Sequence, residues 1–167
     1  MTPGSLGWWL TKVRQTVRHL LARVPARERD AVASWLSPAQ LAMFDGMHVA
    51  DRRHGLDVVA ALRAGGESDP EVLLAGLLHD AGKGDAGMIP RIVHALRQAG
   101  LGWVATLVGW WPGMRETLRR LHDHAELSAQ LAESAGCSAR TVELIRWQDD
   151  PHDPEAGERL RLADEAN

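Results

Sequence analysis

The stretch from Val72 to Lys83, with the sequence V-L-L-A-G-L-L-H-D-A-G-K, constrains the fold of this chain more than any other. Its apolar run is too short to cross a membrane and is typical of a buried helix. Asp69 suits the capping position at the start of that helix, and the proline after it suits the first turn. Gly82 is the expected stop. The stretch therefore predicts a buried helix between Asp69 and Gly82.

His79 and Asp80 lie side by side at the end of this predicted helix. Burying an imidazole and a carboxylate is unfavourable unless a cation or hydrogen bonds receive them. A lone His-Asp pair is more often a capping or hydrogen-bonded couple than a metal site, because a perturbed ionisable pair points to function only statistically. The pair becomes a candidate metal site through its combination with residues of other helices.

Two of these residues are His54 and Asp164. The predicted helix from His48 to Arg63 places His54 on its apolar stripe, and the last predicted helix, which begins at Asp153, places Asp164 on the core side. A histidine on an apolar face is usually a core residue with a hydrogen-bond partner, so His54 alone would carry no function. Its combination with the His-Asp pair makes it a candidate ligand.

His124 is a further inward-facing histidine. The predicted helix from Arg115 to Gly136 places it on one stripe with Ser128 and Leu131, whereas His122 would point away. Three interpretations remain open for His124: a weak ligand of a second metal, a substrate contact, or a core histidine.

The candidate ligands are His54, His79, Asp80 and Asp164. Imidazole and carboxylate together suit Mn²⁺, Fe²⁺, Co²⁺, Ni²⁺ or Zn²⁺ better than Ca²⁺, which prefers oxygen throughout. Such an ion with open coordination positions lowers the pKa of a bound water and polarises a phosphoryl oxygen. The set is therefore suited to hydrolysis without a side-chain nucleophile.

Every segment of the chain follows a helical period, and none alternates like a strand over a useful length. We expect an all-α protein that forms a single helical bundle. Residues 1–47 would form an N-terminal helical segment packed on the metal-binding helical domain of residues 48–167. The basic amphipathic segment from Trp8 to Val24 could lie on an anionic membrane, but a helix packed over its own domain is the commoner case.

Composition narrows the classes of function. A net charge of −3 argues against a dedicated nucleic-acid-binding protein, and the single cysteine, Cys137, excludes an internal disulfide and a multi-cysteine zinc site. The N-terminal residues lack the continuous apolar core of a signal peptide, so we expect a cytoplasmic protein without membrane contact. The uncharged, tryptophan-rich stretch from Ala99 to Met114 falls short of the ~20 residues of a spanning helix and is expected to be buried or partner-facing. A homo-oligomer remains open.

The order His54, His79-Asp80, Asp164, with Lys83 in a His-Asp-x-x-Lys phrase, resembles the HD superfamily of metal-dependent phosphohydrolases. The resemblance covers the chain from about Asp51 to its end. It implies an HD-domain helical bundle in which these histidines and aspartates hold the metal. It also implies cleavage of a phosphomonoester or phosphodiester, possibly of a nucleotide, so that the partner would be a small phosphorylated substrate. Asp80 would also accept a proton from the attacking water, and Lys83 would bind a phosphate oxygen unless it is a solvated surface lysine.

Two departures from the family pattern matter. The segment from His124 to Leu131 resembles a His-Pro-Glu-x-Gly-x-x-Leu segment of members with a second metal, but Trp147 occupies the place where such members have a further histidine. The Gly-Tyr-Pro signature of cyclic-dinucleotide phosphodiesterases is absent as well. We therefore expect one well-formed metal and do not expect that substrate.

Two alternatives belong to other functional classes. Some relatives within the resembled superfamily use two irons on the same scaffold, which suggests a di-iron oxygenase, although Trp147 argues against it. A non-catalytic sensor or interaction module that retains the fold is the other alternative. In that case the stretch from Ala99 to Met114 would be the contact surface.

Overall fold

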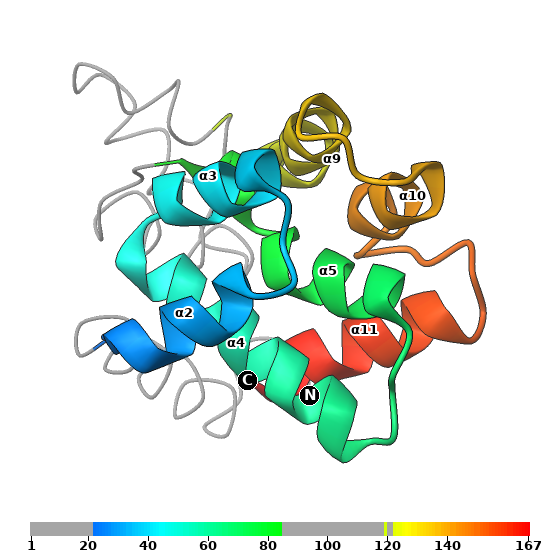
Figure 1. Ribbon diagram of the computed structural model, residues 1–167. Coiled ribbons are helices and arrows are strands. Elements are labelled where there is room, and N and C mark those ends of the chain that lie inside the picture. The colour runs from blue at the N-terminus through cyan, green and yellow to red at the C-terminus, as the bar shows by residue number, and fades with distance from the viewer. Residues whose placement is uncertain (1–21, 85–118, 120–121) are drawn as a thin grey trace, which may run out of the picture.

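The computed structural model describes residues 22–84, 119 and 122–167 of the chain (Figure 1). This part contains α-helices and a short 3₁₀ turn, η1 (Ala81–Lys83), and it has no β-strand. The α-helices are α2 (Ala26–Ala33), α3 (Pro38–Gly46), α4 (Val49–Ala64), α5 (Pro70–Leu78), α9 (His124–Ser134), α10 (Ala139–Arg146) and α11 (Ala156–Ala166). The predicted all-α class is therefore confirmed for the described residues.

Helix α5 is the buried centre of the bundle. Every residue from Val72 to Leu78 is buried, and the helix packs against α4, α10 and α11. Figure 1 shows α5 near the middle of the fold, with α4 and α11 on one side. Asp69 caps the start by accepting a hydrogen bond from the backbone N–H of Glu71 at 2.9 Å. The predicted start and burial of this helix are confirmed.

The predicted end of this helix at Gly82 is wrong. The α-helix ends at Leu78, and η1 follows. Gly82 allows a close approach instead, because a Cβ atom there would lie 2.5 Å from the backbone oxygen of His124 and 2.6 Å from the backbone nitrogen of Ser128. The positive φ that often ends a helical turn occurs at Gly84, at 62°.

Helix α4 carries His54 against α5. Val58 and Leu62, which share the stripe of His54, are buried in the core as predicted. The two helices touch closely at Gly55, where a Cβ atom would lie 2.4 Å from the backbone oxygen of Leu77. This contact fixes the distance between the helix that carries His54 and the helix that delivers His79.

Helix α11 carries Asp164 to the same region. Asp153 opens the helix by accepting a hydrogen bond from the backbone N–H of Ala156 at 2.8 Å. Leu160 and Ala163 are buried against the bundle, while the side chain of Asp164 lies at the edge of the core. The predicted position of Asp164 on the core side is confirmed in this half-buried sense.

The predicted stripe of α9 is only partly correct. Ser128 is fully buried, but the side of the helix that faces the core continues through Ala129 and Ala132, and Leu131 is 45% exposed. α9 lies directly against η1 and α10, so small residues occupy the contact. The predicted helix is present, but the face that it turns to the core contains Ala129 and Ala132 and not Leu131.

The helices that precede α4 share its core. The sequence Ser37-Pro38 is typical of a cap followed by a first helical turn, and Ser37 does cap α3 in a reciprocal pair of hydrogen bonds with Gln40. The charged segment from Ala26 to Leu36 predicts a short helix, and α2 ends within it, at Ala33. Val32 and Phe44 belong to the same hydrophobic cluster as the residues of α5.

Three predicted segments lie largely or wholly outside the described residues. Two of these are the basic amphipathic helix from Trp8 to Val24 and the tryptophan-rich stretch from Ala99 to Met114. The third is a helix from Ile89 to Ala99, which the helical spacing of Ile89, Val93 and Leu96 predicts. Residues 22–24, which end the first of them, are described and are not helical. Within the described part, no helix combines the length and the apolar character that a membrane crossing needs.

Candidate metal centre

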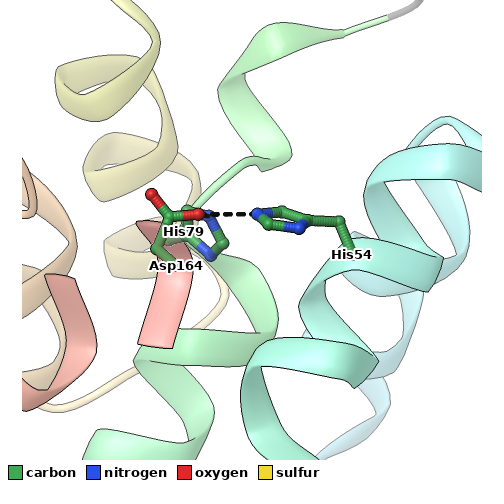
Figure 2. Close-up of side chains that lie close together, drawn as sticks. All are labelled: His54, His79 and Asp164. Atoms are coloured by element: carbon green, nitrogen blue, oxygen red, sulfur yellow. Dashed lines mark hydrogen bonds and ion pairs between the residues drawn. The ribbon is translucent and has the colours of Figure 1, made fainter. Parts of the chain in front are cut away.

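Three of the predicted ligands converge from three different elements (Figure 2). His54 points from α4, Asp164 from α11, and His79 from the end of α5, so that one ligand atom of each lies within 4.8 Å of the others. The Nε2 atom of His54 lies 2.6 Å from Oδ1 of Asp164, and Nε2 of His79 lies 3.4 Å from the same oxygen. The structure thus brings together residues that are far apart in the sequence.

His79 is held in the orientation that a metal ligand needs. Its Nδ1 atom lies 3.0 Å from the backbone oxygen of Gly76, one helical turn earlier, so Nδ1 carries the proton that this carbonyl accepts. Its Nε2 atom is buried and makes no hydrogen bond within the described part of the chain. The lone pair of a neutral His79 therefore points into the cluster.

Asp80 borders this cluster and is equally buried. Its Oδ1 atom lies 3.4 Å from Nε2 of His79 and 3.8 Å from Nε2 of His124, and it makes no hydrogen bond within the described residues. Its Oδ2 atom lies 2.6 Å from Nζ of Lys83 and 4.0 Å from Nε2 of His54. Asp80 is thus adjacent to His54 and His79, with Oδ1 turned toward His79 and Oδ2 paired with Lys83.

The charges in the cluster are strongly coupled. Burial of His79 disfavours its protonated form, but the carboxylates of Asp80 and Asp164 outweigh this effect and raise its pKa to about 9. Burial likewise disfavours the charged forms of the two aspartates. For Asp80 the neighbouring imidazoles and Lys83 outweigh this effect, and for Asp164 the hydrogen bond to His54 and the nearby imidazole of His79 do so. Both aspartates have pKa values below their usual range. At neutral pH the site therefore holds two carboxylates that a protonated His79 balances in part.

Lys83 is not a solvated surface lysine. Its side chain is 23% exposed, and its ammonium group donates a hydrogen bond to Oδ2 of Asp80. Burial lowers the pKa of Lys83, but the charges of Asp80 and Asp51 together raise it, so the ammonium stays charged. In this structure the cation predicted to meet a phosphate oxygen is paired with Asp80.

Of the two residues that bear on a second metal, only His124 lies at the site. It starts α9 and places Nε2 near Asp80, as the inward-facing prediction requires. Trp147 turns elsewhere: its ring stacks on His152, with ring centroids 3.9 Å apart, and lines a surface pocket beside α10. The residue that reaches the site from this end of α10 is Gln148, whose Nε2 lies 3.4 Å from the backbone oxygen of His79.

Sequence reasoning missed three buried polar residues around the ligands. Asp51 lies one helical turn before His54, Ser128 accepts a hydrogen bond from the backbone N–H of Gly82, and Gln148 contacts the backbone of His79. For Asp51 the spacing to His54 on one helix face was an available signal. For Ser128 and Gln148 no local pattern marks the contact, because their partners are backbone atoms of a distant turn.

The donor set fits a divalent transition metal. Nε2 of His79 and Oδ1 of Asp80 are buried and face each other without a hydrogen bond in the described part of the chain, which leaves one nitrogen and one oxygen lone pair for a cation when His79 is neutral. Imidazole and carboxylate donors from His54 and Asp164 complete a mixed set that transition metals accept. The residues present are therefore compatible with the predicted metal.

Comparison with known proteins adds no relative to this picture. No protein-family model matches the chain, and neither a curated protein nor a solved structure matches it significantly.

Proposed function

We propose that this chain is a metal-dependent phosphohydrolase of the HD type, with one divalent transition-metal ion held by His54, His79, Asp80 and Asp164. The observation that carries the proposal is that Nε2 of His79 and Oδ1 of Asp80, both buried, lie 3.4 Å apart beside the His54 and Asp164 side chains and make no hydrogen bond within the described residues. A purely structural core histidine would have hydrogen-bond partners at both ring nitrogens, whereas His79 has one only at Nδ1 among the described residues. A shared cation accounts for both atoms at once.

The metal would supply a bound water of lowered pKa and polarise a phosphoryl oxygen. Asp80 would accept a proton, which is supported by one of its oxygens facing the cluster while the other is paired with Lys83. Asp164 and His54, which lie 2.6 Å apart, would complete the ligand set. The positively charged ammonium group of Lys83 lies next to Asp80 and would also attract the phosphate of an anionic substrate.

The proposed substrate is a small phosphomonoester or phosphodiester, possibly a nucleotide, and the proposed compartment is the cytoplasm. This substrate class follows from the resemblance of the His54, His79-Asp80, Asp164 order and Lys83 to the HD superfamily. The described site supports it through its chemistry: mixed nitrogen and oxygen ligands, a buried carboxylate, and a lysine at the edge.

A second metal is supported by one observation. Nε2 of His124 lies 3.8 Å from Oδ1 of Asp80, so Asp80 could be shared between two ions. No histidine takes the place of Trp147, which turns toward His152. A two-metal centre, including the di-iron type, would therefore have to draw further ligands from elsewhere, and one metal per chain is the proposal.

The test is metal content followed by a substrate screen. Protein purified without added metal is analysed for Mn, Fe, Co, Ni and Zn, and the metal-loaded protein is assayed with p-nitrophenyl phosphate and bis-p-nitrophenyl phosphate. We expect about one ion per chain and hydrolysis that a chelator abolishes. His79→Gln should lose both, whereas His152→Gln, which changes an exposed histidine outside the site, should keep both.

Three other outcomes are informative. No bound metal, even after soaking with Mn²⁺ or Ni²⁺, would overturn the proposal and favour the interaction module. Two ions per chain that both depend on His124 would replace it with a two-metal centre. If the protein binds metal but hydrolyses neither ester, the proposed metal site stands and the proposed phosphohydrolase activity is wrong.

A further inference from the structure

The turn from His79 to Lys83 presents two proposed ligands at the point where helical hydrogen bonding ends. α5 stops at Leu78, His79 is its C-cap, and Asp80 occupies the N-cap position of η1 without a capping hydrogen bond from its side chain. The last carbonyl groups of a helix lack partners within that helix. The backbone of this turn therefore depends on groups from outside α5 for a fixed geometry.

Two buried side chains from other elements bond to this backbone. Gln148, 6% exposed, lies in the turn after α10, and its Nε2 is 3.4 Å from the backbone oxygen of His79. Ser128, fully buried in α9, accepts a hydrogen bond from the backbone N–H of Gly82 at 2.8 Å. Neither contact involves the imidazole of His79 or the carboxylate of Asp80.

Gly82 makes the second contact possible. A Cβ atom at this position would lie 2.6 Å from the backbone nitrogen of Ser128, so η1 and α9 meet backbone to backbone. The hydroxyl of Ser128 is thereby held at hydrogen-bond distance from the turn. The ligand-bearing turn is fixed at its start by Gln148 and near its end by Ser128.

We propose that Gln148 and Ser128 are positioning residues that hold the His79–Lys83 turn in the geometry a metal requires, and that they set metal affinity without touching the metal. The inference rests on the proposed metal site but does not depend on the reaction. Its physical basis is that metal binding tolerates little displacement of its ligands, so groups that orient the ligands contribute to affinity.

The probe is Mn²⁺ alone, titrated calorimetrically into chelator-treated wild type, Gln148→Leu and Ser128→Ala. Each variant removes one hydrogen bond to the turn and leaves every proposed ligand in place. We expect each to weaken Mn²⁺ binding by roughly tenfold, in the range observed when an outer partner of a metal ligand is removed.

Thr141→Val is the matched control. Thr141 is also buried, and its Oγ1 donates to the backbone oxygen of Glu71 at 3.3 Å, at the opposite end of the same helix α5. The control therefore removes a similar buried bond between a side chain and the α5 backbone, far from the ligands. We expect a comparable loss of thermal stability, with Mn²⁺ affinity within about twofold of wild type.

Amide hydrogen exchange of the metal-free proteins supplies a readout independent of the metal. The Gly82 amide should exchange faster in Ser128→Ala than in wild type, and it should be unchanged in Thr141→Val after correction for global stability. Protection at Gly82 that does not depend on Ser128 would overturn the proposed role of Ser128.

The outcomes separate this inference from the proposed function. If wild type binds Mn²⁺ and both Gln148→Leu and Ser128→Ala bind it equally well, the positioning role is wrong and the metal site stands. If affinity falls equally in Thr141→Val, the effect is one of general stability and the inference is again wrong. A wild type that binds no metal would overturn both proposals.

Discussion

Nε2 of His54 lies 2.6 Å from Oδ1 of Asp164, although 110 positions of sequence separate the two residues. The contact joins α4 to α11, and Figure 2 shows the His54 and Asp164 side chains facing each other beside His79. The Asp164 carboxylate helps to balance the charge of protonated His79 when no metal is present, and it would become a ligand when one is. The same geometry would thus suit the site with and without a metal.

Asp164→Asn is predicted to abolish tight metal binding while preserving the fold. The change keeps the shape of the side chain but removes the charge that faces His54 and His79. We expect Mn²⁺ affinity to fall by more than about 100-fold, beyond the usual cost of losing an outer partner. Calorimetric titration measures this, with circular dichroism as the check on folding.

Glu165→Gln is the control for this variant. Glu165 is the neighbouring carboxylate on α11, exposed and paired with Arg161 instead of the cluster. The Glu165→Gln protein should bind Mn²⁺ with the same affinity as the wild type. Equal affinities of Asp164→Asn and wild type would exclude Asp164 as a ligand.

Metal affinity is predicted to rise with pH up to about 9. The pKa of His79 in the metal-free protein is raised to about 9, because Asp80 and Asp164 outweigh the effect of burial. A metal must displace this proton, so between pH 6.5 and 8.5 the affinity should increase by about tenfold per pH unit. Titration in buffers of different ionisation enthalpy should detect about one proton released by His79 for each ion bound.

The stability of the metal-free protein should change in the opposite direction. A pKa that is higher in the folded state than in the unfolded state contributes stability in full below the unfolded value of 6.5, and this contribution is lost as the pH rises through about 9. The melting temperature without metal should therefore fall across this window, and the increase on adding Mn²⁺ should grow. A metal-induced shift in melting temperature that is the same at pH 6.5 and 8.5 would show that His79 does not exchange a proton for the metal.

The helices, and the helix faces that carry the candidate ligands, could be predicted because capping residues and hydrophobic periodicity within each helix determine them. The cap at Asp69, the apolar period around His54, and the position of Asp164 on the core side of its helix are all properties of single helices. The convergence of His54 and Asp164 on His79 could be expected only from the family resemblance. The period of a helix shows which residues face the core, but it does not show which other helix they meet. The structure confirms this convergence, although Asp80 lies beside the cluster of three and turns one oxygen to Lys83.

The incorrect predictions for Gly82 and Leu131 have a common physical cause. Gly82 looked like a helix stop because glycine often ends helices, whereas here it permits the backbone of α9 to approach. Leu131 looked like a core residue because it is large and apolar, yet the close contact selects Ala129 and Ala132. Both depend on which surfaces meet, and a single sequence does not encode that locally.

Lys83→Met is predicted to separate metal binding from reaction. Lys83 pairs with Oδ2 of Asp80, so its removal frees that oxygen and removes a positive charge next to the ion. Mn²⁺ affinity should be equal to or above that of wild type. Ester hydrolysis should fall by about 100-fold or more if Lys83 stabilises the developing charge on the phosphate.

Lys83→Arg retains a cation and should recover part of the activity. The comparison is made at saturating Mn²⁺, with kcat and KM measured separately. A loss of metal affinity in Lys83→Met would mean that Lys83 holds Asp80 in place instead of assisting the reaction, and the catalytic role would be withdrawn.

Gly82→Ala is predicted to destabilise the fold and to weaken metal binding together. The new Cβ atom would lie 2.5 Å from the backbone oxygen of His124 and 2.6 Å from the backbone nitrogen of Ser128, so α9 has to move away from η1. Overpacking of this kind costs about 1–3 kcal/mol, or more where the obstacle is backbone. Urea unfolding monitored by circular dichroism measures the loss.

Gly46→Ala is the matched control, because Gly46 ends α3 and a Cβ atom there meets nothing within 4 Å. It should be neutral or stabilising by up to about 1 kcal/mol, since alanine restricts the unfolded chain more than glycine does. A Gly82→Ala protein as stable as Gly46→Ala would show that α9 is not seated against η1. In that case the placement of His124 next to Asp80 would lose its support, and with it the argument for a second metal.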